Sequence, residues 1–545
     1  METPRRSSNW LCLLPAIVSW VLLFPISGYR HIWQDEAETA ERARSIVEQG
    51  LPRVVDAQGR VSVNTGGLEI EEGTLHRYTP WAQFYLGAIG LAAGKPLGIS
   101  DDAALRGPFI FLHGAGSSLM TYGLVALAGL APTAAVVVGT VFSLQSVRLL
   151  HNRTARYHVL LDFLVIVGVL GLGFFRAGCR REGSMLLAFS IFLLPHSQTL
   201  GGSLLASTLG FMALLLSSLK RDGRLTVGGI ALGLRENFFS ALLPGVVSLG
   251  LLMALSRPWL QGHWAMKGPT TFRGLRSGFE VAYGFYPYVI AMGFLFWKKA
   301  RGVAVAMLVL LLYVLLVGRA LDFHPFSQSR YYLAVPIMFL FWFIPFGRPE
   351  EIKLKDAWIA ALLVVGLLLP DTQGVIPPFQ GLRVIAADFK NRMEKQPLHQ
   401  AVSLIKASGD RGAVLFDYVP QLANWYLRDH PIAMLPDKTN QSKLSLENPV
   451  WESPGPAPVW HLRMVGPYNG FWNCSPDCDI HYKDDTGERY VLEKRSTGEA
   501  FEMCVVASWP TDRWNNAPFS AYEREALEPQ GKAQDRMVLA RRCQN

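Results

Sequence analysis

The sequence predicts a polytopic α-helical membrane domain followed by a soluble α/β or α+β domain. Half of the 545 residues are hydrophobic and the mean hydropathy is +0.21, which is too apolar for an ordinary soluble protein. Charged residues make up 17% of the chain, however, which is too many for membrane spans alone. The composition changes at Val375, after the last long apolar run. We therefore expect a membrane domain over residues 1–374 and a soluble domain over residues 375–545.

The first apolar run, from Trp10 to Ser27, is predicted to be a membrane span that is not cleaved. Arg5 and Arg6 precede it, so the positive-inside rule places the start of the chain in the cytoplasm. The run lacks the small-residue cleavage site of a signal peptide, and many apolar runs follow it. Residues 28–107 are therefore expected to form a long external loop that carries surface helices.

The stretch from Trp33 to Gly50 is predicted to be an amphipathic helix on the outer membrane surface. Its apolar residues recur at roughly helical spacing among charged ones, and Gly50 ends it. Two adjacent carboxylates, Asp35 and Glu36, open this helix just beyond the first span. One interpretation is that Asp35 only caps the free N–H groups of the first turn. The other is that an acidic pair at a membrane face has a chemical function.

Ten further apolar runs are predicted to cross the membrane, which brings the total to about eleven spans. They lie at about 108–128, 133–148, 157–175, 184–196, 199–219, 237–255, 277–297, 302–318, 331–346 and 356–370. The shorter run from Arg77 to Gly98 is expected to lie on the surface or to be re-entrant. If each long run crosses once, the loops rich in lysine and arginine lie in the cytoplasm. The odd number of spans then places the C-terminus outside.

The C-terminal domain is predicted to contain both helices and strands. Helical spacing marks residues 388–408 and 422–428, and strands are expected at 412–419, 488–496 and 499–509. About 170 residues are enough for one soluble domain.

Four of the six cysteines lie in this domain, at Cys474, Cys478, Cys504 and Cys543. An even number in an external compartment indicates two disulfides, most simply Cys474 with Cys478 and Cys504 with Cys543. A metal site at the closely spaced first pair is the rival interpretation.

The predicted external loops gather cations and polar side chains. Positive charge beside a span is expected on the cytoplasmic side, so arginines on the outer side require another explanation. Such arginines either snorkel to lipid headgroups or bind an anion, because guanidinium groups bind phosphate oxygens bidentately. The polar side chains on these loops are His76, Arg77, Arg106, Arg153, Arg156, Gln328 and Arg330.

Several short motifs occur in a fixed order along residues 1 to about 370. They are the acidic pair Asp35–Glu36, the aromatic Y-x-P stretch Tyr78–Tyr85, the R-G-P entry to the next span Arg106–Pro108, the R-x-x-R-Y motif Arg153–Tyr157 and the R-Y-Y-x-x-x-P motif Arg330–Pro336. In this order the motifs resemble those of the GT-C superfamily of integral-membrane glycosyltransferases. Within that superfamily, the motifs are most similar to those of the lipid A aminoarabinose transferases, protein O-mannosyltransferases and bacterial arabinofuranosyltransferases. Thr79 departs from the pattern, since many relatives carry a lysine there, and Arg77 is the candidate for that contact.

The resemblance implies inverting transfer of a sugar from a polyprenyl-phosphate donor to a glycan, glycolipid or protein acceptor. The reaction would take place on the outer face of the bacterial cytoplasmic (inner) membrane, with membrane lipid as a further partner. Asp35 would be the general base, and Glu36 would cap the helix, orient Asp35 or bind a divalent cation with it. The formal charge of +9 is dispersed over many loops, so no nucleic-acid partner is expected.

The resemblance also implies binding residues. The donor phosphate would be held by Arg77, Arg153, Arg156, Tyr157 and Arg330, and other parts of the substrate by His76, Tyr78, Gln328 and Tyr331. No metal site and no further cofactor are assigned.

Two other classes of function compete with this one. A transporter or flippase of a lipid-linked sugar would also need external cations, but apart from Asp162 the predicted spans contain almost no acid or base. No Walker loop or G-x-G-x-x-G loop is present in a strand–helix setting, which disfavours an ATP-driven pump. A non-catalytic membrane protein that binds glycan is the third class.

Overall fold

The structure is a computed structural model of the whole chain. It describes residues 9–54, 74–77, 79–256, 301–320, 334–347, 355–368, 380–393, 396–416, 420–433, 457–465, 480–494, 498–510 and 536–544. The chain divides into two compact units. The first consists of Met1–Pro25, Thr79–Leu86 and Arg106–Ala386, and the second of Ile26–Tyr78, Gly87–Leu105 and Ala387–Asn545.

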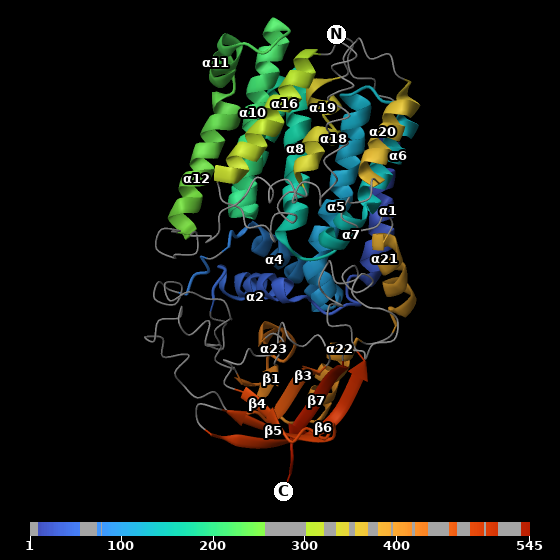
Figure 1. The fold of residues 1–545 in the computed structure, drawn as a ribbon, viewed down its shortest axis with the longest axis vertical. Helices are drawn as coiled ribbons and strands as arrows, with labels where there is room; N and C mark the ends of the chain where they lie inside the picture. Colours follow the sequence, from blue (N-terminus) through green and yellow to red (C-terminus); the bar gives the residue numbers. More distant parts are fainter. Residues whose placement is uncertain are drawn as a thin grey trace. The chain divides into compact units, whose positions relative to one another are not determined.

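The first unit is helical (Figure 1). Its helices are α1 (Leu14–Leu23), α6 (Pro132–Leu144), α7 (Ser146–Asn152), α8 (Tyr157–Arg176), α9 (Arg180–Ser197), α10 (Thr199–Asp222), α11 (Val227–Glu236), α12 (Leu243–Ser256), α16 (Arg301–Ala320), α18 (Val335–Leu340), α19 (Phe343–Phe346) and α20 (Asp356–Leu368). Three more helices contain residues of both units: α4 (Ala82–Gly94), α5 (Asp101–Ala126) and α21 (Gln380–Asn391).

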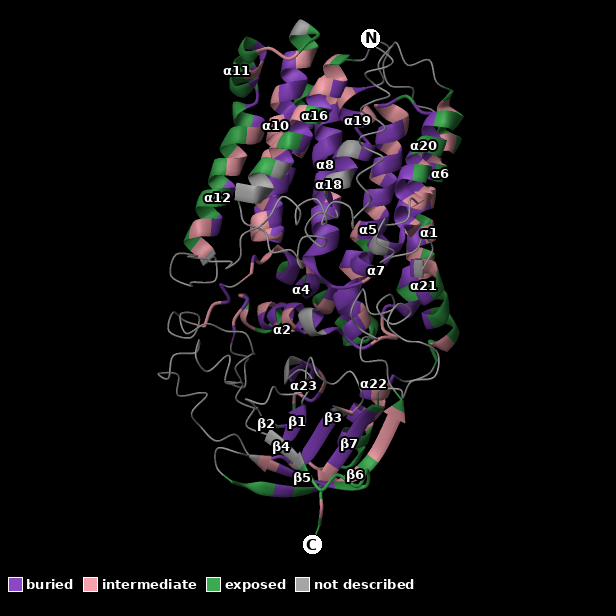
Figure 2. Ribbon diagram, in the orientation of Figure 1, coloured by how far each residue is buried: buried purple, intermediate pink, exposed green. Residues whose placement is uncertain are grey.

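Helix α8 forms the centre of the first unit. It is buried along nearly its whole length, whereas α12 exposes much of its apolar surface (Figure 2). Two glycines bring α8 and α9 close together. A Cβ atom on Gly171 would lie 2.9 Å from the carbonyl oxygen of Gly183, and one on Gly183 would lie 2.6 Å from the backbone nitrogen of Phe175. Larger side chains at these positions would force the two helices apart.

Several helices are long and apolar enough to cross a membrane. Within the described residues these are Asp101–Ala126, Tyr157–Arg176, Thr199–Arg221 and Phe238–Leu255, and shorter apolar helices accompany them. The expected fold class, a multi-pass helical membrane protein with a C-terminal sheet domain, is confirmed. The predicted span at 277–297 lies outside the described residues. Residues 331–346, predicted as one span, instead contain the two short helices α18 and α19.

The sequence placed some helix boundaries incorrectly. The span predicted from residue 108 begins earlier, at Asp101, because the carboxylates of Asp101 and Asp102 are favoured in a first helical turn. The predicted helix 388–408 is two helices, α21 and α22 (Pro397–Ala407). Pro397 accounts for the break, because proline is accepted in a first turn but not in a helix interior.

The second unit contains α2 (Gln34–Gln49) and a seven-stranded sheet with α22 and α23 (Pro420–Tyr426) packed on it (Figure 1). The strands are β1 (Val414–Phe416), β2 (Ile432–Ala433), β3 (Trp460–Val465), β4 (Ile480–Lys483), β5 (Arg489–Lys494), β6 (Ala500–Pro510) and β7 (Arg536–Arg542). Their order is β2-β1-β3-β7-β6-β5-β4. The pairs of β1 with β2 and β3 are parallel and the others are antiparallel, so the sheet is mixed.

The sequence predicted β1, β5 and β6 but missed β2, β3, β4 and β7. Of these, β2 and β4 are short edge strands, whereas β3 and β7 lie near the middle of the sheet and carry charged residues that apolar patterns do not reveal. Arg463 of β3 is only 5% exposed, since its guanidinium lies over the Tyr490 ring at 3.9 Å and bonds to Asp485. Paired in this way, a cation is tolerated in a buried strand.

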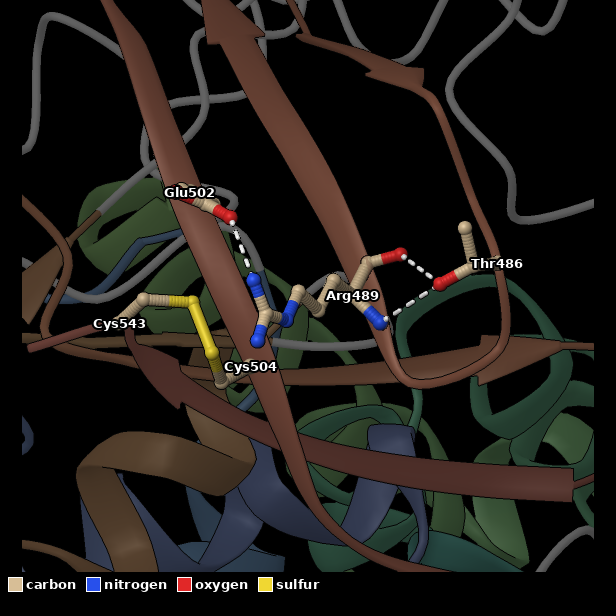
Figure 3. The surroundings of a disulfide bond; sticks show 5 residues. All are labelled: Thr486, Arg489, Glu502, Cys504 and Cys543. Atoms are coloured by element: carbon tan, nitrogen blue, oxygen red, sulfur yellow. Dashed lines mark hydrogen bonds and ion pairs between the residues drawn. A yellow bond between two sulfur atoms is a disulfide. The ribbon is translucent and has the colours of Figure 1, made fainter.

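Cys504 of β6 and Cys543, just beyond β7, form a disulfide (Figure 3). This confirms one of the two expected bridges, while Cys474 and Cys478 lie outside the described residues. Arg489 and Glu502 lie beside the bridge with their charged groups 3.6 Å apart. Among the described residues, Cys12 and Cys179 are free thiols.

We expect the Cys504–Cys543 bridge to stabilise the sheet substantially. It links residues 39 apart in sequence, and the chain-entropy estimate for such a loop is about 4 kcal/mol. The Cys504→Ser/Cys543→Ser protein should therefore unfold at a lower temperature than the wild type in a non-reducing buffer. A Cys12→Ser variant is the control, because it removes a free thiol only. Equal unfolding temperatures in all three proteins would contradict the expectation.

Asp485 makes the stability of the sheet depend on pH. Partial burial raises the pKa of its carboxyl, but hydrogen bonds from Arg463 at 2.6 Å and from the Gly487 N–H at 2.9 Å outweigh this, and the pKa lies below its ordinary value. A lowered pKa contributes stability above the unfolded-state value and loses it as the pH falls. When the unfolding temperature is measured between pH 6 and pH 3, we expect it to decrease once the pH is below about 4.

The Asp485→Asn variant should lose that part of the pH dependence. The neighbouring Asp484→Asn variant is a matched control, because asparagine also adopts the left-handed backbone (φ 52°) found at Asp484. If Asp485→Asn and the wild type responded to acid identically, this account of the carboxylate would be wrong.

Candidate functional site

The first turn of α2 is capped by Glu36. Trp33 is the N-cap, with an extended backbone, and its N–H donates to Glu36 Oε2 at 2.9 Å. The Glu36 side chain is completely buried. Asp35 lies between them in the first turn of the helix, and its side chain lies outside the described residues. A capping contact at this helix start is therefore made by Glu36, and the roles expected for Asp35 stay predictions.

Helix α2 is buried on more than its apolar face. Ala37, Ala40 and Ala43 are fully buried, as the helical spacing predicts, but so is Thr39, and Arg42 is 2% exposed. Small side chains on α2 let α4 approach closely. A Cβ atom on Gly87 of α4 would lie 3.1 Å from the Ala43 Cβ atom and 3.6 Å from Thr39 Cγ2. The helix ends at Gly50, whose φ of 80° suits glycine.

His76, predicted to bind substrate, is held against α2. Its Nδ1 accepts a hydrogen bond from Arg42 Nε at 3.2 Å, and its Nε2 lies 3.6 Å from Glu38 Oε1. The backbone N–H of His76 donates to the carbonyl of Pro52 at 2.8 Å. Arg77 follows directly and is 8% exposed. The structure thus places His76 against Glu38 and Arg42 of α2 in the second unit, with Arg77 next to it in the chain.

The R-x-x-R-Y motif forms a tight turn between α7 and α8 in the first unit. The Thr154 hydroxyl donates to the His151 carbonyl at 2.6 Å, and the Arg156 N–H donates to the Thr154 carbonyl at 2.9 Å. Arg156 is 7% exposed, and its guanidinium carbon lies 5.4 Å from the centre of the Tyr157 ring. Arg153 is half-buried. Three predicted phosphate-binding residues therefore share one turn at the start of α8.

A buried polar network lies beneath this turn. Arg148 of α7 forms an ion pair with Asp162 of α8, which also accepts from Asn152 Nδ2 at 3.0 Å. Asn152 contacts His113 of α5 at 3.1 Å, and His113 Nε2 lies 3.0 Å from the carbonyl oxygen of Ser143. In the sequence, Asp162 stands out as an isolated acid within a predicted span. Its partner Arg148 does not, because a residue 14 positions away in an apolar stretch has no local signal.

The remaining site predictions are not described by the structure. Tyr78, Gln328, Arg330 and Tyr331 lie outside the described residues. Within the described residues no group of three histidine, cysteine, aspartate or glutamate side chains is placed to hold a metal ion. The acidic pair with His76 and Arg77 belongs to the second unit, and the R-x-x-R-Y turn belongs to the first.

The chain resembles solved structures of membrane glycosyltransferases. No protein-family model matches the sequence, and no curated protein matches it either. One similar structure is ArnT from Cupriavidus metallidurans bound to undecaprenyl phosphate, with 13% identity, a TM-score of 0.46 and coverage of 87% of this chain and 96% of that one. The same protein in the apo state has 14% identity, a TM-score of 0.44 and coverage of 84% and 93%.

A second similar protein is the Archaeoglobus fulgidus oligosaccharyltransferase in the apo form. It has 12% identity and a TM-score of 0.45, and the match covers 96% of this chain and 78% of that one. Both proteins belong to the GT-C superfamily, the class that the sequence motifs resemble. At such scores the likeness assigns no activity to this chain.

Proposed function

We propose that this protein is an inverting glycosyltransferase that takes a sugar from a polyprenyl-phosphate donor, with Asp35 as general base. The observation that carries the proposal is the capping of α2 by Glu36. That contact assigns Glu36 to the Trp33 N–H, so of the two carboxylates of the acidic pair we assign Asp35 to catalysis. In the proposal it lies on the outer face of the cytoplasmic membrane, beside the acceptor.

The reaction is a single displacement. An acceptor hydroxyl or amine attacks the anomeric carbon of the donor, and the bond from that carbon to the phosphate oxygen breaks as the new bond forms. Asp35 takes the proton of the attacking group. The lipid phosphate leaves with the electron pair of the broken bond, and its growing negative charge is stabilised by fixed guanidinium groups. Arg153 and Arg156 are the described candidates, with Arg77 and Arg330 as further ones.

Donor turnover by the purified protein tests the proposal. The full chain in detergent would be incubated with hexosyl and pentosyl derivatives of undecaprenyl phosphate, and released undecaprenyl phosphate would be measured with glycan, glycolipid and peptide acceptors. We expect release that depends on the acceptor and is absent from heat-treated protein. Binding of the lipid without release would overturn the proposal and favour a transporter or a binding protein.

Arg156 provides a prediction about donor binding. The Arg156→Ala protein should bind undecaprenyl phosphate about 10-fold or more weakly, since a charge-assisted hydrogen bond contributes about 1.5–3 kcal/mol. Arg156→Lys should restore only part of this affinity, because lysine lacks the planar fork of arginine. Binding would be measured by ligand-induced quenching of tryptophan fluorescence in detergent.

The control for this prediction is Arg180→Ala. Arg180 is an exposed arginine of α9 in the same unit, so its loss changes the net charge equally. We expect its affinity to match the wild type. If Arg156→Ala and Arg180→Ala bound the lipid equally well, Arg156 would be removed from the proposed site.

A further inference from the structure

Three side-chain donors converge on one buried carboxylate, that of Asp102. Asp102 is the second residue of α5 and is 6% exposed. Its Oδ1 accepts from Trp425 Nε1 at 2.8 Å, and its Oδ2 accepts from the Tyr426 hydroxyl at 2.7 Å and from His399 Nε2 at 3.2 Å. All three donors come from α22 and α23, and all four residues belong to the second unit. The two carboxylate oxygens of Asp102 are thus shared among three partners from the C-terminal part of the chain.

Tyr426 extends this network to the start of α2. Its hydroxyl donates to Asp102 and accepts from the backbone N–H of Ile32 at 2.8 Å. Ile32 is completely buried and stands three residues before Asp35. The next N–H, that of Trp33, is bonded to Glu36. Two consecutive backbone donors that lead into the helix are therefore held by side chains, one of which belongs to the C-terminal part of the chain.

The far half of α2 is held by the same part of the chain. The Arg44 guanidinium stacks on the Trp425 ring at 3.9 Å and donates to the Trp425 carbonyl at 3.2 Å. Glu48 forms an ion pair with Arg428 at 2.5 Å. Burial lowers the pKa of Arg44, although the charge of Glu41 opposes this. These contacts fix the axis of α2, and the Tyr426 contact fixes the path of the chain into its first turn.

We propose that Tyr426 and Asp102 are positioning residues that set the first turn of α2 and thereby aim the Asp35 carboxylate. This inference rests on the proposed function, in which Asp35 is the base. It gives the C-terminal domain a part in catalysis through the position of α2, in addition to any part in acceptor binding. The physical reason is that a base displaced by about 1 Å costs about 100-fold in rate.

The first test measures how well the backbone amides at the start of α2 are protected from exchange, and it needs no substrate. Hydrogen exchange of the full-length protein in detergent would be followed for peptides that cover residues 29–40. Tyr426→Phe removes one hydroxyl and leaves the Ile32 N–H without that acceptor. We expect exchange in this segment to become about 5- to 10-fold faster, the change that corresponds to about one hydrogen bond. Asp102→Asn should act in the same direction, because its amide group replaces one of the acceptor oxygens.

Tyr490→Phe is the matched control. Tyr490 is a buried tyrosine of the same unit, and its hydroxyl bonds to His461 Nδ1 at 2.6 Å. Its loss removes a comparable hydrogen bond from within the sheet domain. We expect normal exchange at residues 29–40 in this variant. Unchanged exchange in both Tyr426→Phe and Asp102→Asn would overturn the inference, whatever the activity of the protein.

The second test links the position of the helix to the rate. With a hexosyl or pentosyl undecaprenyl phosphate that the wild type turns over, kcat of Tyr426→Phe should fall about 10- to 100-fold while KM for the donor changes less than about 2-fold. Tyr490→Phe should keep the wild-type kcat. Adding Tyr426→Phe to Asp35→Asn should cause no further loss, because both changes act on one group.

The outcomes separate this inference from the proposed function. Faster exchange with an unchanged kcat, in a protein whose Asp35→Asn variant is inactive, would overturn the positioning role while leaving Asp35 as the base. An additional 10-fold loss in the double variant would overturn it as well. A fully active Asp35→Asn variant would instead refute the proposed base, and the exchange result would still decide whether Tyr426 and Asp102 hold the start of α2.

Discussion

The Asp35→Asn protein is expected to transfer sugar at least about 100-fold more slowly than the wild type while it binds undecaprenyl phosphate normally. General base catalysis contributes about 100- to 10,000-fold, and asparagine cannot take up the proton. The fold should survive, because the α2 cap depends on Glu36 and because asparagine suits a helix start about as well as aspartate. The measurement is kcat of the purified full-length protein, together with its affinity for the lipid.

Glu36→Gln is the control for this change. The amide oxygen of glutamine can still accept the hydrogen bond from the Trp33 N–H, so the cap should be retained. We expect a loss of less than about 10-fold, well below that of Asp35→Asn. A fully active and stably folded Asp35→Asn protein would end the proposed mechanism and direct attention to the other carboxylates outside the membrane.

Loss of either Arg148 or Asp162 is expected to destabilise the membrane unit by about 3–5 kcal/mol. Arg148 is 1% exposed and Asp162 is 3% exposed, so removing either one deprives a deeply buried charge of its ion-pair partner. Arg148→Met or Asp162→Leu alone should therefore lower the temperature at which the purified protein unfolds in detergent. The Arg148→Met/Asp162→Leu double variant should recover most of the loss, because it removes both members of the buried pair.

An exposed ion pair provides the comparison. Lys483 and Glu493 pair across β4 and β5, and the Lys483 side chain is 57% exposed. We expect Lys483→Ala to change stability by less than about 1 kcal/mol, since solvent already screens the pair. If the Arg148 and Asp162 single variants were as stable as Lys483→Ala, or if the double variant were the least stable, the ion pair would not hold α7 against α8.

Long apolar helices were the features that the sequence predicted best. The expected spans at 157–175 and 302–318 correspond closely to α8 and α16. Length and hydropathy suffice for such helices, because each must satisfy its own backbone hydrogen bonds in lipid. The amphipathic helix after Trp33 was also predicted correctly, since its spacing and its terminal Gly50 are local signals. Predictions failed for β3 and β7, whose charged residues are paired only in the folded sheet.

The candidate site was predicted only in part. The acidic pair and the R-x-x-R-Y turn are short motifs with a recognisable order, so their chemistry was visible before the fold. The structure adds that Glu36 accepts a hydrogen bond from the Trp33 N–H, a contact that sequence spacing did not reveal, and the catalytic role of Asp35 stays a prediction. Arg148 and Asp102 carried no such signal. Each acquires its role from partners that are distant in sequence and that meet it only in the folded chain.

The sequence by itself determined that this chain is a multi-pass membrane protein with a C-terminal sheet domain and an acidic pair after the first apolar segment. These properties depend on composition and on residues close together in the chain. The tertiary structure alone decided that Tyr426 and Asp102, 324 positions apart, meet at 2.7 Å and hold the backbone at Ile32. The physical reason is that a hydrogen bond requires an approach within about 3 Å. For residues so distant in sequence, only the folded chain provides that approach.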